Sequence, residues 1–240
     1  MDTAKKMNGS SEKSETNDFV AFFLPNCYEK LLSRIIKTFD DRIVRAYCKV
    51  RFIIININIL HILSLCLRGK CKILEIGCGF GLYGLYLSSL FPEISYCGYD
   101  INSKRVEMAN LAARRLGLQN IKFKCQDARV LRIDEKFDAI VMIDLLHHLD
   151  NNSKSSLLEM CSRHLTCEGR LVIKEVTTHP FWKLAFTWTL DVLMTRGFQI
   201  WYLDEMSFNV LLRNHFSRIN TFPIADWLPY SHIVYLCENI

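Results

Sequence analysis

Three glycines at alternate positions, Gly77, Gly79 and Gly81, directly follow a short apolar segment, residues 71–76. Glycine has no β-carbon, so the backbone N–H groups of such a turn can approach a ligand that side chains would block. We expect a strand over residues 71–76 and a helix over residues 82–91. A strand, a glycine turn and a helix in this order are typical of nucleotide or nucleoside binding.

Two nucleoside cofactors fit this turn. Gly79, Gly81 and Gly84 match the G-x-G-x-x-G pattern in which a helix N-terminus holds the pyrophosphate of a dinucleotide. In that pattern the first glycine follows the strand directly, whereas here Gly77 comes first and Glu75 lies at the strand end. The alternate-glycine spacing therefore fits the end of the strand better than the dinucleotide pattern does.

The segment from Glu75 to Gly81 resembles the first motif, acidic-x-G-x-G-x-G, of the class I S-adenosylmethionine-dependent methyltransferases. The resemblance implies an enzyme that uses S-adenosyl-L-methionine. It assigns the cofactor contacts of this turn to Glu75, Gly77, Cys78, Gly79 and Gly81.

The second motif of that family is matched at the end of a predicted strand, residues 95–100. Asp100 lies about 20 residues beyond the glycines, a spacing at which a carboxylate reaches the hydroxyl groups of a ribose. By resemblance, Ile101 lies against the adenine. A strand-end aspartate taken alone is more typical of a helix cap, but the order of the motifs favours the ribose ligand for Asp100.

Two further motifs follow in order. After a predicted strand at residues 121–125, the family places a side chain that accepts from the adenine amino group, and Asp127, followed by Ala128, fits that place. A turn residue is the alternative for Asp127. The predicted fourth strand, residues 137–144, ends in Asp144, similar to the family's segment near the transferring methyl group.

Candidate catalytic residues follow the fourth and fifth predicted strands. His147 and His148 come after the fourth strand, and Glu175 and His179 come at and after the end of the fifth, residues 170–175. Open α/β sheets bind ligands at the carboxyl ends of their strands, and histidine is a suitable general base. A base is needed only when the acceptor must lose a proton. The alternative is that the two histidines shape the site or cap a helix.

The acceptor is indicated by an apolar segment after the fifth strand. Residues 180–194 are helical in composition and apolar on nearly all sides, which predicts a helix that is buried, faces lipid or lines an apolar pocket. We therefore favour a small, hydrophobic or lipid-like acceptor, with core packing or a dimer interface as the alternative. An RNA or protein methyltransferase and a catalytically silent S-adenosylmethionine-binding protein stay open. No DNA partner is expected, because the segment after the fourth strand lacks the Asn/Asp-Pro-Pro-aromatic pattern of N6-adenine enzymes.

Strands that alternate with helices predict an α/β fold with a parallel sheet wound on both faces. The resemblance implies a Rossmann-like, doubly wound, seven-stranded sheet that closes with an antiparallel hairpin at the C-terminus. Predicted strands at residues 217–222 and 233–237 fit that hairpin. We expect the methyltransferase domain over residues 71–240, with an apolar acceptor-side insertion at about 177–216.

The N-terminal part divides into a polar tail and a helical cap. Residues 1–18 lack an apolar anchor and are expected to be disordered. Residues 19–70 are expected to form the cap, with an amphipathic helix from Tyr28 to Phe39. The apolar segment 52–67 contains two asparagines and a histidine and is shorter than the roughly 20 residues of a spanning helix. It favours a single core helix, with a membrane-surface element as the alternative and a true span as a remote one.

Composition sets the remaining limits. A chain of 240 residues that is 50% hydrophobic and 23% charged fits one α/β domain better than two. The ten cysteines are scattered, without spacing for a metal, so they predict free thiols in a reducing cytoplasm and no metal site. A net charge of +5 permits peripheral contact with an anionic membrane without requiring it, and the oligomeric state stays open.

Overall fold

The computed structural model describes residues 25–176, 178, 188, 200–224 and 232–239. The predictions for the tail 1–18 and, apart from Trp188, for the apolar segment 180–194 concern residues outside this part.

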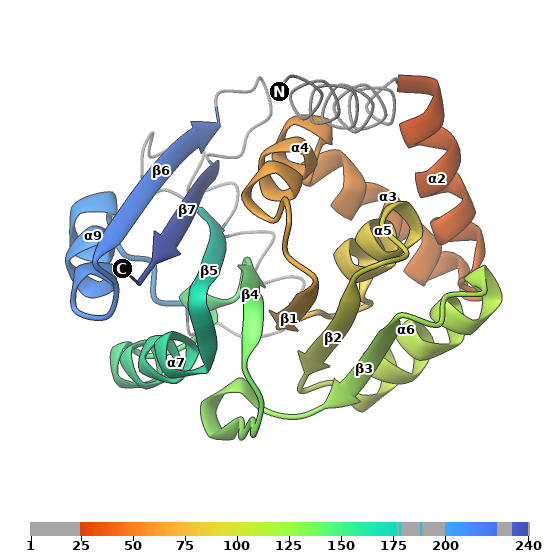
Figure 1. Ribbon diagram of the computed structural model, residues 1–240. Helices are drawn as coiled ribbons and strands as arrows, with labels where there is room; N and C mark the ends of the chain where they lie inside the picture. The colour runs from red at the N-terminus through yellow and green to blue at the C-terminus, as the bar shows by residue number, and fades with distance from the viewer. Residues whose placement is uncertain (1–24, 177, 179–187, 189–199, 225–231, 240) are drawn as a thin grey trace, which may run out of the picture.

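A seven-stranded sheet forms the centre of the molecule (Figure 1). Its strand order is β3-β2-β1-β4-β5-β7-β6. The first five strands in chain order pair in parallel, while β7 is antiparallel to both β5 and β6. The strands are β1 (Lys72–Ile76), β2 (Ser95–Asp100), β3 (Ile121–Cys125), β4 (Phe137–Ile143), β5 (Leu165–Val176), β6 (Arg218–Ile224) and β7 (His232–Glu238). This confirms the predicted fold, including its C-terminal antiparallel hairpin.

The strand order also locates a ligand crevice. From β1 the chain builds outward to β2 and β3, and it then returns to the other side of β1 to add β4 and β5. Because open α/β sheets bind their ligands where the strand order reverses, we expect a ligand crevice at the carboxyl ends of β1 and β4.

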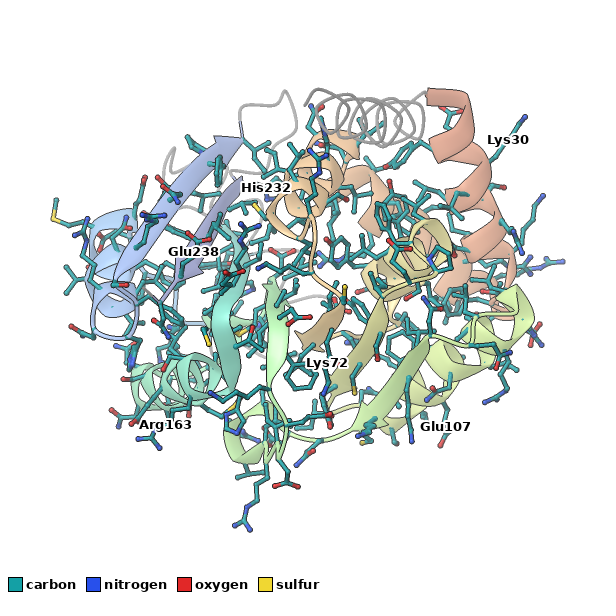
Figure 2. All side chains as sticks on the ribbon, in the orientation of Figure 1. Lys30, Lys72, Glu107, Arg163, His232 and Glu238 are labelled. Atoms are coloured by element: carbon teal, nitrogen blue, oxygen red, sulfur yellow. The ribbon has the colours of Figure 1, made fainter. Side chains whose placement is uncertain are left out.

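Helices cover both faces of the sheet, and side chains fill the space beneath them (Figure 2). Because successive side chains of a strand point to opposite faces, Ile73 of β1 joins one apolar core and Leu74 joins the other. The first core lies under the helices α2 to α6, and the second lies under α7 and α9. The helices are α2 (Pro25–Lys37), α3 (Arg42–Ile54), α4 (Ile57–Cys66), α5 (Leu82–Leu90), α6 (Ser103–Leu116), α7 (Asn151–His164) and α9 (Glu205–Arg213), with 3-10 turns at η1 (Ala128–Val130) and η2 (Leu146–His148).

Helix α6 shows how local sequence fixes the element that follows β2. The side chain of Asn102 accepts a hydrogen bond from the backbone N–H of Arg105 at the start of the helix. Gly117 ends it in the left-handed conformation, with φ of 75°. Both ends follow the usual preferences for helix caps, so local sequence determines where this helix begins and ends.

The apolar segment 52–67 differs from the prediction of a single helix. It contains the end of α3 and all of α4, which are bent by 72° at the break between them. The break lies at Asn56, whose side chain accepts from the N–H groups of Asn58 and Ile59 and so begins a new helix. Burial of Ile59 and Leu63 agrees with a position in the core. In the described part of the chain, no single helix is long and apolar enough to cross a membrane.

Candidate active site

The glycine turn lies directly after β1 and is tied to the end of β2. Gly77, Gly79 and Gly81 all have positive φ, at 80°, 54° and 68°. The N–H groups of Gly77 and Cys78 donate to the carbonyl oxygen of Tyr99 at 2.7 and 3.0 Å. This conformation requires glycine at the three alternate positions, which explains the spacing in the sequence.

The three glycines differ in what surrounds them. A β-carbon on Gly81 would lie 2.4 Å from the ring of Phe123, and one on Gly77 would lie 2.9 Å from Leu145. A β-carbon on Gly79 would meet nothing within 4 Å. The absence of a β-carbon at Gly81 and Gly77 therefore lets the side chains of Phe123 and Leu145 pack against the turn. Gly79 instead leaves an open backbone surface that a nucleoside can approach.

Asp100 contributes its carboxylate to the same place. Its Oδ2 accepts from the N–H of Gly79 at 2.8 Å, and its Oδ1 accepts from the N–H of Asn102 at 2.9 Å. The side chain that caps α6 is that of Asn102, so Asp100 does not serve as the cap and contacts the glycine turn instead. A carboxylate has about four acceptor positions, so two more hydrogen bonds, enough for a ribose diol, are available. The neighbouring Ile101 is 61% exposed, as a residue that packs against adenine would be before the ligand binds.

Asp127 and Ala128 follow β3, beside the end of β2. The N–H of Gln126 donates to the carbonyl oxygen of Asp100 at 2.9 Å, which brings the two strand ends together. The Asp127 carboxylate caps η1 and accepts from the guanidinium Nε of Arg129 at 3.0 Å. This hydrogen bond lowers the pKa of Asp127. The structure therefore shows Asp127 as a turn residue, and its contact with adenine stays a prediction.

Glu75 lies in the core beneath the glycine turn. Its side chain is buried, and its Oε2 accepts a hydrogen bond from the hydroxyl group of Tyr96 at 2.9 Å. Burial raises the pKa of Glu75 to about 7, although the hydrogen bond from Tyr96 opposes that change. The carboxyl group is therefore part of the buried structure next to the turn. Its direct contact with the cofactor stays a prediction.

Asp144 begins the segment after β4 with an unusual backbone. Its φ of 52° makes it the one non-glycine residue with positive φ in the described part of the chain. Its carboxylate pairs with Lys174 of β5 at 2.5 Å and with Arg51 of α3 at 2.9 Å. Burial alone would raise the pKa of Asp144, but these two cations hold it well below its ordinary value. The ion pairs join the helical cap, β4 and β5 at the edge of the crevice.

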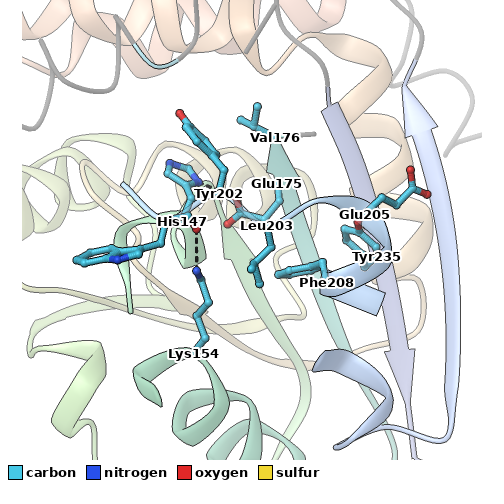
Figure 3. Close-up of a pocket in the computed structure, with 10 residues that line it drawn as sticks. His147, Lys154, Glu175, Val176, Tyr202, Leu203, Glu205, Phe208 and Tyr235 are labelled. Atoms are coloured by element: carbon cyan, nitrogen blue, oxygen red, sulfur yellow. Dashed lines mark hydrogen bonds and ion pairs between the residues drawn. The ribbon is translucent and has the colours of Figure 1, made fainter. Parts of the chain in front are cut away.

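A second buried pair lies one turn further along. In Figure 3, His147 and Glu175 lie side by side, and the His147 Nδ1 is 2.6 Å from the Glu175 Oε2. The other carboxylate oxygen, Oε1, accepts from the N–H groups of Leu145 and Leu146 at 3.2 and 2.7 Å. Because Oε1 of this carboxylate already accepts from two backbone N–H groups, the short contact at Oε2 favours a proton on Nδ1 of the imidazole. This leaves Nε2 as the basic nitrogen.

The two remaining catalytic candidates are His148, which the structure describes, and His179, which it does not. The ring of His148 lies 4.2 Å from that of His147. Burial, and then the neighbouring His147, lower the pKa of His148 to about 4, so this ring is neutral at pH 7. His179 lies outside the described residues and stays a prediction.

A small pocket opens beside His147 (Figure 3). Its volume is about 20 Å³, enough for one water-sized group. The N–H of Trp201 donates to the carbonyl oxygen of His147 at 2.8 Å, and the Lys154 ammonium donates to the carbonyl oxygen of Trp201 at 2.7 Å. The ring of Tyr202 stacks on that of His147, with centroids 5.3 Å apart. The residues that line the pocket are His147, Lys154, Glu175, Val176, Trp201, Tyr202, Leu203, Glu205, Phe208 and Tyr235.

Three residues of the site were not predicted from the sequence: Arg51, Lys174 and Tyr202. A signal existed for Lys174, because a lysine inside an apolar strand requires a buried counter-charge, and Asp144 ends a neighbouring predicted strand. No local pattern indicates Arg51 or Tyr202, since each reaches the site from a distant part of the chain.

Residues 73–169 match a family model described as a methyltransferase domain. This stretch contains the glycine turn, Asp100, Asp127, Asp144 and the two histidines. Residues 73–169 therefore carry the methyltransferase domain that this model describes. S-adenosylmethionine is the cofactor of the class I methyltransferases, as the glycine turn predicts.

Individual proteins similar to this methyltransferase domain differ in what they act on. A malonyl-[acyl-carrier protein] O-methyltransferase from Bacillus cereus is 30% identical over 113 residues, 47% of this chain and 40% of that protein. The ribosomal RNA small subunit methyltransferase G of Mesoplasma florum is 34% identical over 104 residues, 42% of this chain and 41% of that protein. The chain thus matches about two fifths of the length of these relatives.

Solved structures with a similar fold also include methyltransferases. A solved S-adenosylmethionine-dependent methyltransferase from Clostridium acetobutylicum superposes with a TM-score of 0.58 at 16% identity, covering 74% of this chain and 89% of that one. Likeness at this identity supports the fold alone, and the site rests on the residues described above.

Proposed function

We propose that this chain is an S-adenosylmethionine-dependent methyltransferase that acts on a small, hydrophobic or lipid-like acceptor. One observation carries the proposal. The glycine turn and Asp100 lie on one side of the β1/β4 crevice, and the paired His147 and Glu175 follow β4 and end β5 at its other side. A nucleoside site and a candidate base thus meet where the sheet binds ligands.

The residues present fit S-adenosylmethionine. The open backbone at Gly79 would face the nucleoside, Asp100 would accept from the ribose hydroxyls, and Ile101 would pack against the adenine. When bound, the cofactor supplies an electrophilic methyl group on a sulfonium. The protein must then align the acceptor with that group and exclude water. His147 is 3% exposed and the side chain of Asp144 is 11% exposed, which supports the exclusion of solvent at this end of the crevice.

His147 is our candidate for the base. Glu175 holds the ring through Nδ1, and its two hydrogen bonds from backbone N–H groups fix the carboxylate in turn. In this arrangement Nε2 would take the proton from an acceptor O–H or N–H as the methyl group is transferred. The ionised Glu175 would stabilise the imidazolium that forms.

The acceptor class rests on parts of the chain outside the family match. The two relatives named above differ in acceptor by their names, one a protein-bound malonyl group and the other ribosomal RNA. The match to this domain therefore does not distinguish between these acceptors. A hydrophobic acceptor is supported by the apolar composition of residues 180–194 and by Val176, Leu203 and Phe208 along the pocket wall.

Transfer of a labelled methyl group tests both parts of this proposal. The purified chain is incubated with methyl-labelled S-adenosylmethionine and cell extract, which is then separated into organic, RNA and protein fractions. We expect label in the organic fraction, and none with Asp100→Ala. Label in RNA or protein would refute the hydrophobic acceptor, and cofactor binding without label in any fraction would indicate a silent binding protein.

His147→Asn separates the base from the cofactor site. We expect this variant to bind S-adenosylhomocysteine as tightly as the parent, measured by isothermal titration calorimetry. Its methyl transfer should fall by about 10²- to 10⁴-fold, the usual contribution of a general base. Unchanged transfer would show that the acceptor needs no base from His147.

A further inference from the structure

The outer face of α3 carries a row of exposed apolar side chains. We define this face as Ile43, Ala46, Val50 and Ile53. Ile43 is 80% exposed, Val50 49% and Ile53 59%, and Ala46 is exposed as well. At 3.6 residues per turn these four positions fall on one side of the helix. Large apolar side chains that share one helix face indicate a surface that binds something.

Basic residues border this outer face. Arg42, Arg45 and Lys49 follow one edge of it, and α3 contains no acidic residue. An apolar row with cations along its edge is the pattern by which a helix lies in the surface of an anionic membrane. The apolar side chains enter the boundary between headgroups and acyl chains, and the cations meet the lipid phosphates.

The inner face of the same helix reaches the candidate active site. The ring of Tyr47 lies 5.2 Å from that of Phe80 in the glycine turn. Arg51 pairs with Asp144 at 2.9 Å. Figure 1 shows α3 between α2 and α4. A surface that holds the outer face of α3 is therefore one helix diameter from the crevice, about 10 Å.

We infer that the outer face of α3 binds the surface of anionic lipid membranes. This goes beyond the proposed methyl transfer and does not depend on it. A second copy of the chain is a poorer occupant for two reasons. An antiparallel two-fold contact along α3 would bring Arg42, Arg45 and Lys49 close to the same cations of the other copy. Four side chains of one short helix also fall well short of the roughly 800 Å² per partner that a stable protein interface buries.

Vesicle binding tests this inference with the full chain and without cofactor or acceptor. Binding is measured by co-sedimentation with vesicles of phosphatidylcholine alone and of phosphatidylcholine with 30 mol% phosphatidylglycerol. The test variant is Ile43→Asp/Val50→Asp. Its matched control is Met206→Asp/Val210→Asp on α9, where the two side chains are 79% and 58% exposed. Circular dichroism and thermal melting establish that both variants fold.

We expect the parent and the α9 control to bind anionic vesicles, and Ile43→Asp/Val50→Asp to bind them at least tenfold more weakly. Replacing Lys49 by Gln should weaken binding about fivefold, because one cation near an anionic surface contributes that much. The inference is overturned if the parent ignores anionic vesicles, or if the α3 and α9 variants bind equally. It is also overturned if analytical ultracentrifugation shows a dimer that Ile43→Asp/Val50→Asp dissociates while the parent binds no vesicles, since this would assign the face to a second copy.

Discussion

Replacing Glu75 by Gln should make the protein more stable at pH 8 and change it little at pH 5. Glu75 lies beneath the glycine turn with its side chain 3% exposed, and Tyr96 is its hydrogen-bond partner at 2.9 Å. Burial disfavours the charged form and raises the pKa of this carboxyl group to about 7. Glutamine has almost the same shape, stays neutral, and can still accept the hydrogen bond from Tyr96.

The magnitude follows from the difference in pKa between the unfolded and folded chains. A rise from the ordinary 4.5 to about 7 corresponds to about 3 kcal/mol at 1.36 kcal/mol per pH unit. Between these two values the folded state keeps a proton that the unfolded state releases. The contribution of Glu75 to stability is therefore fully present below about pH 4.5 and is lost as the pH rises through 7. Above pH 7 the ionised Glu75 lowers the free energy of unfolding of the parent protein by the full amount. Glu75→Gln removes this destabilisation.

Urea denaturation at pH 5 and pH 8 measures the effect. We expect Glu75→Gln to gain about 2–3 kcal/mol over the parent at pH 8, and less than about 1 kcal/mol at pH 5. The matched control is Glu93→Gln, at an exposed position, which should change neither value. An equal difference between the variant and the parent at both pH values would refute the reasoning, because it would mean that Glu75 ionises as easily in the folded chain as in the unfolded one.

Three other perturbations test the cofactor site and the buried charges. Asp100→Ala should weaken S-adenosylhomocysteine binding about 100-fold in isothermal titration, because two charge-assisted hydrogen bonds of about 1.5 kcal/mol each are lost; an unchanged affinity would remove Asp100 from the site. Gly79→Ala and Gly117→Ala both force alanine to a positive φ in open space, so each should cost about 1–2 kcal/mol, but only Gly79→Ala should weaken cofactor binding. Lys174→Met should cost about 3–5 kcal/mol in urea denaturation, and adding Asp144→Asn should recover part of that loss; purely additive losses would contradict a strong ion pair.

The sequence predicts the sheet and the glycine turn well because local rules determine them. Asn102 and Gly117 mark the ends of α6 by their capping preferences, and alternate glycines permit a turn with three positive φ values. The same local rules failed at residues 52–67. A continuous apolar run suggested one helix, whereas a single hydrogen-bonding side chain, Asn56, divides it into two.

The site was predicted only as far as its residues follow strands in order. Asp100, Asp144 and His147 lie at one edge of the sheet because parallel strands bring their carboxyl ends together, and their roles stay predictions. Arg51 and Tyr202 contact that edge from segments far away in the sequence, and such contacts leave no periodic or local pattern. The ionisation of Glu75 was not predicted either, because it depends on burial from all sides.

We expect the segments outside the family match to select the acceptor. Residues 73–169 match a domain found in proteins whose names give different acceptors, so the match alone does not distinguish those acceptors. Arg51 lies before it, and Glu175 and Tyr202 lie after it, yet all three contact Asp144 or His147 at the end of β4. The cap and the C-terminal segments thus meet the end of β4 from two sides. If α3 binds a membrane, one of those sides is held at the lipid surface, and a lipid-like acceptor would reach the crevice without crossing water.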